Sequence, residues 1–380
     1  RDFAREFRGE VLLPSGLEAL EQLGLDKIFT AVPRSRPSSV EIFANARPVL
    51  TLAIGPDLVG PHGPTAFSQP AFLAAVVADA GRLSTFTVEL GAVVVDLLRN
   101  RGRIAGVVVD DGDRQREIRA DLVIGADGRA SAVRRHGGFG ARRQGLDVDV
   151  VWFKTALPDF YGGDTPVRVY LGRAHLLIAY AAADGRLQVA WVITKGSYGE
   201  LRSRGVEQWL DEMCGHVTPD LAEHLRGHRD DLSHTFLLSA VSDRVESWWR
   251  PGALLIGDAA HTMSPVGGQG INIALRDAVV AANHLVPPLL EGRGSRPLAA
   301  GLAVDLDAAC AAIEKERLPE LEAVQRIQAA PPRILMGRRW WSHALRATLP
   351  RLLRSRMARR AAAPTVRTLL RGEGEVRLQV

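Results

Sequence analysis

The residues best suited to chemistry form one run, Leu254–Ala278, in which a short apolar stretch ends at Gly257-Asp258 and a glycine-rich loop precedes a helix. Glycine allows a backbone to approach a ligand where a side chain would collide. A helix beginning at Gly270 would direct unpaired N–H groups and the positive end of its dipole at the loop. Asp258 could accept hydrogen bonds from sugar-like hydroxyls. The run therefore predicts a site for a ligand whose reduced form is anionic. The alternative is a strand–turn–helix whose glycines serve packing alone.

A second run, Ala120–Arg135, has the same order of elements: an apolar strand, a Gly/Asp loop and a helix. Asp127 in this loop could accept hydrogen bonds from N–H groups at the helix start, or reach the phosphate–ribose part of a cofactor. This run is less specific than the first, and an ordinary structural connection is its alternative.

Together these runs resemble the second and third flavin-binding motifs of the class A FAD-dependent monooxygenases, the p-hydroxybenzoate hydroxylase-like group. The segment REFRGEVLLPSGLEALEQLGL (5–25) is similar to the part that follows the family's first βαβ unit, and FSQPAFLAAV (67–76) to its cofactor-contacting helix. The resemblance covers nearly the whole chain. It implies an α/β fold, with a glutathione-reductase-like FAD-binding domain built on a parallel sheet and an interleaved antiparallel β-sheet substrate domain.

The resemblance also implies domain limits and cofactor contacts. The FAD domain would comprise residues 1–140 and 242–330, and the substrate domain residues 141–241. Residues 331–380 would form an arginine-rich helical region. Residues ~40–68 could belong to the substrate domain instead of the FAD domain. Arg8 would approach the FAD pyrophosphate, Gln69 the pyrophosphate–ribityl side, Asp127 and Gly128 the cofactor generally, and Asp258 the ribityl chain. Pro265 would lie beside the isoalloxazine, and Gly267, Gly268, Gln269, Gly270, Ile271 and Asn272 would offer backbone donors to its N1–C2=O edge.

The activity that the resemblance implies is oxygen transfer to an organic molecule. NADPH or NADH would reduce FAD, O2 would add as a flavin C4a-hydroperoxide, and one oxygen atom would hydroxylate or epoxidise a small aromatic, polyketide-like or lipid substrate. A flavin-dependent reductase is an alternative. Halogenation is disfavoured because the Trp-x-Trp-x-Ile-Pro string of the tryptophan halogenases is absent.

No catalytic base can be assigned from the sequence, and no metal site is expected. The candidates on the substrate side are His62, Tyr161, Tyr170, His175 and Tyr180, although packing or surface roles are commoner for such residues. His261, inside the first run, is expected to satisfy local hydrogen bonds rather than to transfer protons.

The sequence departs from the family at its first motif, because no Gly-x-Gly-x-x-Gly string is present. The acidic residue that binds the adenosine ribose is missing with it. We therefore expect an N-terminal βαβ unit to be missing, and this chain to bind FAD weakly or not at all. A truncated, non-catalytic remnant is the corresponding alternative.

Composition limits the other function classes. Apolar residues make up 46% and charged residues 24% of the chain, which is typical of a globular protein. The net charge is +5, but residues 333–371 contain 11 arginines and no Asp, Glu or Lys, which leaves −6 on the remainder. Nucleic-acid binding is therefore not expected. The arginine-rich segment could pack on the acidic body or contact a membrane surface peripherally. The two cysteines and the lack of a run of ~18 apolar residues fit a cytoplasmic location; oligomeric state stays open.

Hydrophobic periodicity predicts the elements that position these runs. Helices are expected at about Pro14–Gly24, Pro70–Gly81, 206–226 and Ile271–Leu285, with further helix to Ala330 and a break at Pro331-Pro332. The expected strands are Val49–Ile54, Phe86–Leu90, Ala92–Leu97, Gly102–Asp110, Gln115–Arg119, Ala120–Gly125, Val148–Thr155, Val167–Leu171, Leu176–Ala181, Leu187–Thr194, 234–241 and 253–257.

Overall fold

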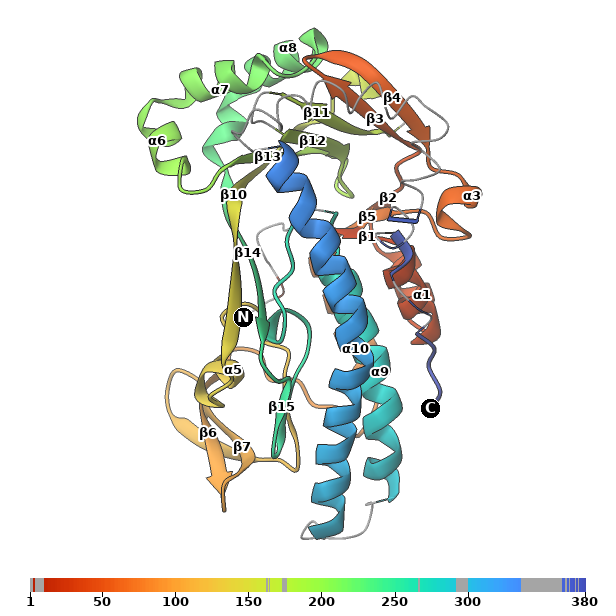
Figure 1. The fold of residues 1–380 in the computed structure, drawn as a ribbon, viewed down its shortest axis with the longest axis vertical. Coiled ribbons are helices and arrows are strands. Elements are labelled where there is room, and N and C mark those ends of the chain that lie inside the picture. Colours follow the sequence, from red (N-terminus) through yellow and green to blue (C-terminus); the bar gives the residue numbers. More distant parts are fainter. Residues whose placement is uncertain are drawn as a thin grey trace.

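The computed structural model describes residues 3, 10–161, 163, 165–172, 176–265, 267–291, 300–335, 364–365, 368, 370–372, 374 and 376–380. These residues form a mixed α/β fold whose largest sheet lies at one end of the molecule (Figure 1). Two long helices, α9 (Gly270–Glu291) and α10 (Ala300–Leu335), lie side by side along most of its length.

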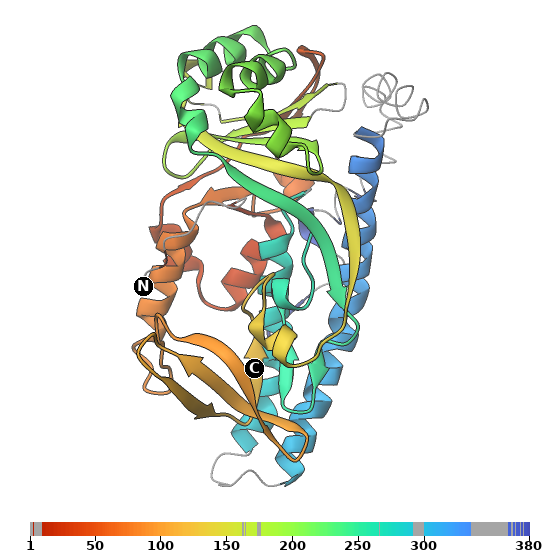
Figure 2. The same ribbon diagram turned by 90° about the vertical axis from the view of Figure 1, so that its left-hand side faces the viewer.

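The largest sheet has seven strands and is antiparallel except for one pair. Its order is β14 (Phe236–Val245), β10 (Ala141–Ala156), β13 (Arg186–Thr194), β12 (Leu176–Ala181), β11 (Val167–Leu171), β3 (Ser39–Ala44) and β4 (Arg47–Ala53). Only β11 and β3 run parallel within it. The strands β10 and β14 extend beyond the other strands of the sheet and, still paired with each other, reach the rest of the molecule (Figure 2). The predicted antiparallel block is therefore confirmed, and residues 39–53 join it.

Short helices cover the outer face of this sheet: α6 (Tyr198–Ser203), α7 (Val206–Cys214) and α8 (Pro219–Gly227). Trp209 of α7 stacks on Trp191 of β13, with ring centroids 5.7 Å apart. The helical stretch predicted over 206–226 is confirmed as two helices, because Gly215 ends α7 and Pro219 opens α8 in the first helical turn, where its missing N–H costs nothing.

Three small sheets complete the strands. They are β15 (Trp249–Arg250), β16 (Ala253–Leu255) and β9 (Val123–Gly125); β6 (Val93–Asn100), β7 (Arg103–Asp110) and β8 (Gln115–Arg119); and β1 (Val11–Leu12), β5 (Thr65–Phe67) and β2 (Arg34–Ser35).

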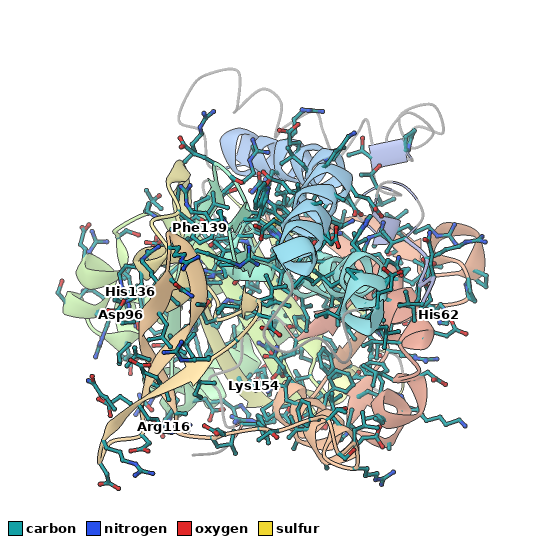
Figure 3. The ribbon with its side chains drawn as sticks, turned by 90° about the horizontal axis from the view of Figure 1, so that it is seen from below. His62, Asp96, Arg116, His136, Phe139 and Lys154 are labelled. Carbon is teal, nitrogen blue, oxygen red and sulfur yellow. The ribbon has the colours of Figure 1, made fainter. Side chains whose placement is uncertain are left out.

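The strand predicted at Phe86–Leu90 is wrong. Its alternating apolar side chains look half-buried, but Phe86, Val88 and Leu90 are 39–52% exposed and no described strand pairs with them. Between them, Glu89 forms an ion pair with Arg116, which lies on the β6–β7–β8 sheet (Figure 3).

The remaining helices are α1 (Pro14–Gln22), α2 (Asp26–Ala31), α3 (Pro56–Val59), α4 (Gln69–Ala80) and α5 (Ala132–His136). The predicted starts and ends of α1 and α4 are confirmed within two residues. Pro14 occupies the first turn of α1, and Gly24 follows it with a φ of 69° that glycine adopts without strain. The Ser68 side chain accepts a hydrogen bond from Ala71 N at the start of α4.

Two predicted helix ends are wrong for the same reason. Helix α9 continues through Pro287 and Pro288 to Glu291, and α10 continues through Pro331-Pro332 to Leu335. Each proline lacks an N–H and removes its own i→i−4 hydrogen bond, but this loss does not end either helix.

Helix α9 has the length and mean hydropathy, 1.2, of a membrane span. It is nonetheless a core helix, since it packs against α1 and α10 and buries Arg276 and Asp277 in ion pairs. The chain end also packs on it: Gln379 N donates to Asn283 Oδ1 at 2.7 Å. The sequence left two roles open for the arginine-rich segment 333–371, packing on the acidic body and contact with a membrane surface. This segment falls largely outside the described residues.

Candidate cofactor site

The two runs that could do chemistry lie next to each other. Strands β9 and β16 are parallel neighbours, so the loops that follow them leave the same edge of the small sheet. Ile256 N donates to Gly125 O at 3.0 Å. Beyond this bond, Arg129 Nε donates to Asp258 Oδ2 at 3.2 Å and links the two loops directly. The fold thus brings together residues that are 129 positions apart in the sequence.

Asp127 holds the start of α5. Its Oδ2 accepts hydrogen bonds from Ala132 N at 2.6 Å and from Val133 N at 3.2 Å. Asp127 therefore accepts hydrogen bonds from N–H groups at a helix start, which is the first of the two roles expected for it. Gly128 follows with a φ of 79°, and a Cβ placed on it would meet no atom within 4 Å. The loop consequently presents bare backbone to open space.

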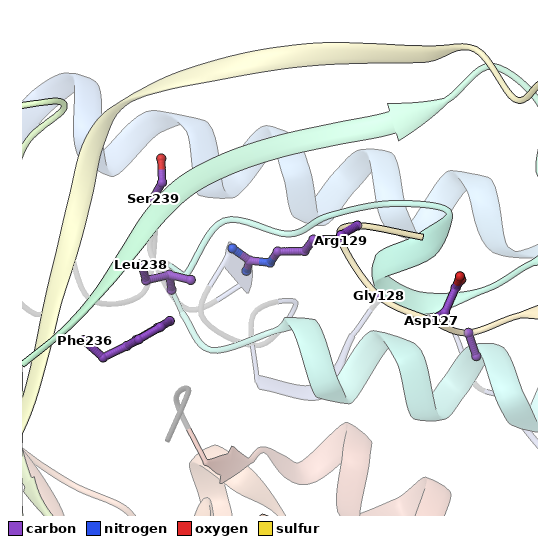
Figure 4. Close-up of a pocket in the computed structure, with 8 residues that line it drawn as sticks. Asp127, Gly128, Arg129, Phe236, Leu238 and Ser239 are labelled. Atoms are coloured by element: carbon purple, nitrogen blue, oxygen red, sulfur yellow. The ribbon is translucent and has the colours of Figure 1, made fainter. Parts of the chain in front are cut away.

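A cavity of about 410 Å³ lies between this loop and β14 (Figure 4). It is lined by Ala126, Asp127, Gly128, Arg129, Ala130, Phe236, Leu238 and Ser239. The Arg129 side chain extends from the loop toward Leu238, so its guanidinium carries positive charge into the space (Figure 4). The start of α9 follows Asp258 along the chain, at Gly270.

The start of α9 is fixed by Asn272. Its buried side chain accepts a hydrogen bond from Leu13 N at 2.8 Å and donates to Gly268 O at 2.8 Å. A Cβ on Gly16 would collide with this amide, so the glycine lets α1 approach closely. The glycines before the helix, in contrast, stay open: a Cβ on Gly268 would meet nothing within 4 Å.

Gln269, between these residues, has a fully buried side chain. Neither its Oε1 nor its Nε2 has a hydrogen-bond partner among the described residues. Buried amides are normally paired with protein, water or ligand. The start of α9 therefore has an amide whose hydrogen-bond partner is not supplied by the described residues.

A buried ion network supports the Gly257 turn from below. Asp277 accepts hydrogen bonds from Gly257 N at 3.0 Å, His261 Nε2 at 2.7 Å and Arg317 Nε at 2.8 Å. Burial alone would raise the pKa of Asp277, but His261 and Arg317 outweigh it and hold that pKa below its usual value. His261 thus satisfies local hydrogen bonds, as predicted. Glu320 completes the network by pairing with Arg317 and Arg276.

Asp243 is a second supporting residue that sequence reasoning missed. It is 5% exposed and accepts a hydrogen bond from Thr262 N at 3.1 Å, and its carboxylate pairs with Arg134 Nη1 at 3.4 Å. It therefore connects β14, α5 and the loop after Asp258. The available signal was an acidic residue inside the apolar strand pattern of 236–245.

The other predicted residues are distributed around this centre. Gln69 opens α4, where its backbone hydrogen-bonds the Glu10 carboxylate, and Pro265 is a half-buried loop residue. Arg8 lies outside the described residues.

Of the base candidates, Tyr161 and Tyr170 lie in the outer-face core, where Tyr161 Oη donates to Ala179 O at 3.2 Å and Tyr170 Oη bonds Thr218 Oγ1. His62 pairs with Glu21 at the surface. Tyr180 lies on the inner face, and His175 falls outside the described residues.

These features fit a flavin dinucleotide. Open backbone at Gly128 and Gly268, the carboxylate of Asp258 with its side chain 33% exposed, and the orphaned Gln269 amide offer donors and acceptors to a long polar ligand. The N-terminus of α9 favours an anionic ring edge.

Comparison with known proteins decides the family. Residues 1–300 match the FAD binding domain family. The chain is 31% identical to 6-methylpretetramide 4-monooxygenase of Streptomyces rimosus, over 98% of this chain and 84% of that protein. It is 29% identical to kynurenine 3-monooxygenase of Stenotrophomonas maltophilia, over 59% of this chain and 48% of that protein. The chain belongs to the FAD-dependent monooxygenase family.

Solved structures confirm the predicted fold of this family member. PqsL of Pseudomonas aeruginosa in complex with 2-aminobenzoylacetate superimposes with a TM-score of 0.73 at 22% identity, over 90% of each chain. A variant of HpxO from Klebsiella pneumoniae complexed with FAD gives 0.72 at 19% identity, over 97% of this chain and 91% of that one. FAD is the cofactor that the family assigns to the chain.

Proposed function

We propose that the chain is an NAD(P)H-dependent monooxygenase that oxygenates a small aromatic or polyketide-like molecule. The observation that carries this proposal is the Arg129–Asp258 bond, which joins the two motif loops beside a cavity that the Ala126–Ala130 loop lines. The named activities of the two relatives, on 6-methylpretetramide and kynurenine, support an aromatic or polyketide-like substrate class.

In this proposal the loop residues hold the cofactor. Asp258 accepts hydrogen bonds from the ribityl hydroxyls, Gly267–Asn272 offer backbone donors to the flavin ring edge, and Gln69 and Asp127 lie along the remainder. FAD, when bound, supplies the transfer of electrons from NAD(P)H to O2 and the insertion of one oxygen atom. The apolar inner face of the large sheet, with Leu238 and its buried neighbours, excludes water from the substrate side.

The division into domains follows from the sheets. We assign β9, β16, α9 and α10 to the FAD side and the seven-stranded sheet to the substrate side, with β3 and β4 included in the latter. Among the described residues, β9 is an outer strand of its three-stranded sheet.

Flavin titration tests the cofactor part. We expect Asp258→Ala to weaken FAD binding by roughly 10- to 100-fold, as for loss of a hydrogen bond to a charged group. The matched control is Asp113→Ala, which removes an exposed carboxylate in the turn between β7 and β8. Equal affinity of the two variants would contradict the assignment of Asp258.

Turnover tests the activity itself. With FAD supplied, the chain should oxidise NADPH or NADH and take up O2 faster in the presence of an aromatic substrate panel. Submicromolar affinity for FAD would show that the two motifs suffice. A protein that stays flavin-free and consumes no NAD(P)H would make this chain a non-catalytic remnant of its family.

A further inference from the structure

Residues 376–380 lie against α1 and α9 and are held there through their backbone (Figure 1). On the α1 side, Gln22 Nε2 donates to Val376 O at 2.9 Å, and Gln22 Oε1 accepts from Leu378 N at 2.6 Å. One side-chain amide thus pairs with a carbonyl and with the N–H two residues later, as a neighbouring strand does in a parallel sheet.

Helix α9 holds the other edge of the same segment. Asn283 Nδ2 donates to Arg377 O at 2.7 Å, and Asn283 Oδ1 accepts from Gln379 N at 2.7 Å. Between these bonds, Val376 packs against the core cluster that includes Leu285 of α9. We call the described residues of 371–380 the strap. Two helices therefore hold the strap by both of its edges.

The strap also contacts the buried ion network. Arg276 Nη2 donates to Gly374 O at 3.0 Å, while Arg276 Nε lies 2.9 Å from Glu320 Oε1. A Cβ on Gly372 would collide with Glu320 Oε1 and lie 3.2 Å from Arg276 Cζ. Glycine at this position therefore lets the strap backbone lie directly on the Arg276–Glu320 pair.

A continuous series of buried bonds leads from this contact to the cofactor turn. Glu320 pairs with Arg317, Arg317 Nε donates to Asp277 Oδ1 at 2.8 Å, and Asp277 Oδ2 accepts from Gly257 N at 3.0 Å. Gly257 directly precedes Asp258. Glu320, Arg317 and Asp277 are each at most 4% exposed. Because buried charges must stay paired, a shift of Glu320 requires its partners to shift with it.

We propose that the strap is a positioning element for cofactor binding. When docked, it fixes Glu320 and, through Arg317 and Asp277, the turn that presents Asp258 to FAD. The inference deepens the proposed function and rests on it for the role of Asp258, but not for the coupling between strap and turn. Coupling between two sites is reciprocal, so FAD bound at the turn should also strengthen the docking of the strap.

Two strap glycines provide a matched pair of variants. Gly372 and Gly374 have φ angles of 77° and 76°, so an alanine introduces similar backbone strain at either position. Only the Cβ of Gly372→Ala would collide with Glu320, whereas a Cβ on Gly374 would meet nothing within 4 Å. The difference between Gly372→Ala and Gly374→Ala therefore isolates the contact with the ion network.

Hydrogen exchange tests the coupling without FAD. Mass spectrometry of the full chain follows the peptide that contains Gly257, whose N–H is bonded to Asp277. Exchange in this peptide should be about tenfold faster in Gly372→Ala than in Gly374→Ala. Exchange in β13, which lies in the seven-stranded sheet, should be equal in the two variants. A strap that only stabilises the fold as a whole would not single out the turn.

A second pair of variants releases the strap from the helix side. Asn283→Ala removes both bonds to Arg377 and Gln379 at a half-buried helical position, where alanine favours the helix. His284→Ala is its control, because it removes the neighbouring pair with Glu316 on α10. Exchange at Gly257 should be faster in Asn283→Ala than in His284→Ala, which keeps the test decisive if Gly372→Ala does not fold.

Flavin titration then connects the coupling to the cofactor. FAD should bind about tenfold more weakly to Gly372→Ala than to Gly374→Ala, and FAD should slow exchange of the Leu378 and Gln379 N–H groups in the unmodified chain. Equal affinity of the two glycine variants, with FAD bound, overturns the inference and leaves the proposed function standing.

The remaining outcomes separate the inference from the proposed function. Equal exchange at Gly257 within both pairs of variants, or faster exchange throughout the chain in Gly372→Ala and Asn283→Ala, overturns the inference. Faster exchange confined to the Gly257 peptide supports the coupling of strap and turn, even where no variant binds FAD and the role proposed for Asp258 falls.

Discussion

Two groups of buried polar side chains differ in their hydrogen bonding. In the ion network beneath Gly257, Asp277 accepts three hydrogen bonds, and Arg317 and Glu320 each have charged partners. On the inner face of the large sheet, Tyr180 and Gln188 are as deeply buried but lack partners among the described residues.

This difference should appear in stability. A buried charge is tolerated only when it is paired, so removing one partner from the network leaves another charge uncompensated. Neutral donors and acceptors cost less when unpaired. Substitutions in the network should therefore destabilise the fold, whereas removal of an unpaired group from the sheet face should not.

The largest effect is expected from Asp277→Ala. It leaves His261 buried without its carboxylate and Arg317 with Glu320 alone, and should lower the free energy of unfolding by ~3–5 kcal/mol. Chemical denaturation measures this value. The control is Glu322→Ala, which removes an exposed partner of Arg244 and should cost ~0–1 kcal/mol. Similar losses in both variants would show that the network contributes no more than a surface ion pair.

The second effect contrasts two tyrosines on opposite faces of one sheet. Tyr161→Phe removes a hydrogen bond to Ala179 O and should cost ~0.5–1.5 kcal/mol of unfolding free energy. Tyr180→Phe removes a hydroxyl without a partner in the protein, so stability should stay unchanged or rise by up to ~1 kcal/mol. Thermal unfolding of both variants without ligand decides the matter. A clear loss in Tyr180→Phe would reveal a partner for that hydroxyl within the chain.

Local patterns made much of the fold predictable. Strands β11 and β12 have the predicted bounds, because short apolar runs between turns depend on neighbouring residues alone. The stretch Phe86–Leu90 has the same alternation but no pairing strand in the described part of the chain, and whether a strand finds a partner is a property of the whole fold. The proline pairs in α9 and α10 were misjudged because a proline removes one hydrogen bond of a helix without necessarily ending it.

Some residues of the candidate site could also be predicted from the sequence, and others could not. Both motif loops were recognisable because glycines and an aspartate follow a strand at short spacing. Asp243, Asp277 and Arg317 were not, since each acts on a loop 16 to 40 residues or more distant through contacts that only packing creates. That Lys154, Gln188 and Tyr180 lie opposite one another on neighbouring strands depends on register, which no single strand reveals.

The smallest effect, and the one that links the two regions, concerns Glu10. Burial raises the pKa of this carboxyl above its usual 4.5, although Lys154 and the Gln69 backbone lower it in part. A raised pKa in the folded state means that stability is fully present below pH 4.5 and is lost as pH rises through the folded value. Glu10→Gln should therefore leave the Tm unchanged near about pH 4 and raise it near about pH 7, where only the unmodified chain must ionise a buried group. Lys154 keeps Asp184 as its partner in the variant. A lower Tm for Glu10→Gln near neutral pH would mean that the Glu10–Lys154 pair stabilises the fold, and Lys154, opposite Gln188 in the sheet, would then belong with the paired network rather than with the unpaired groups of the sheet face.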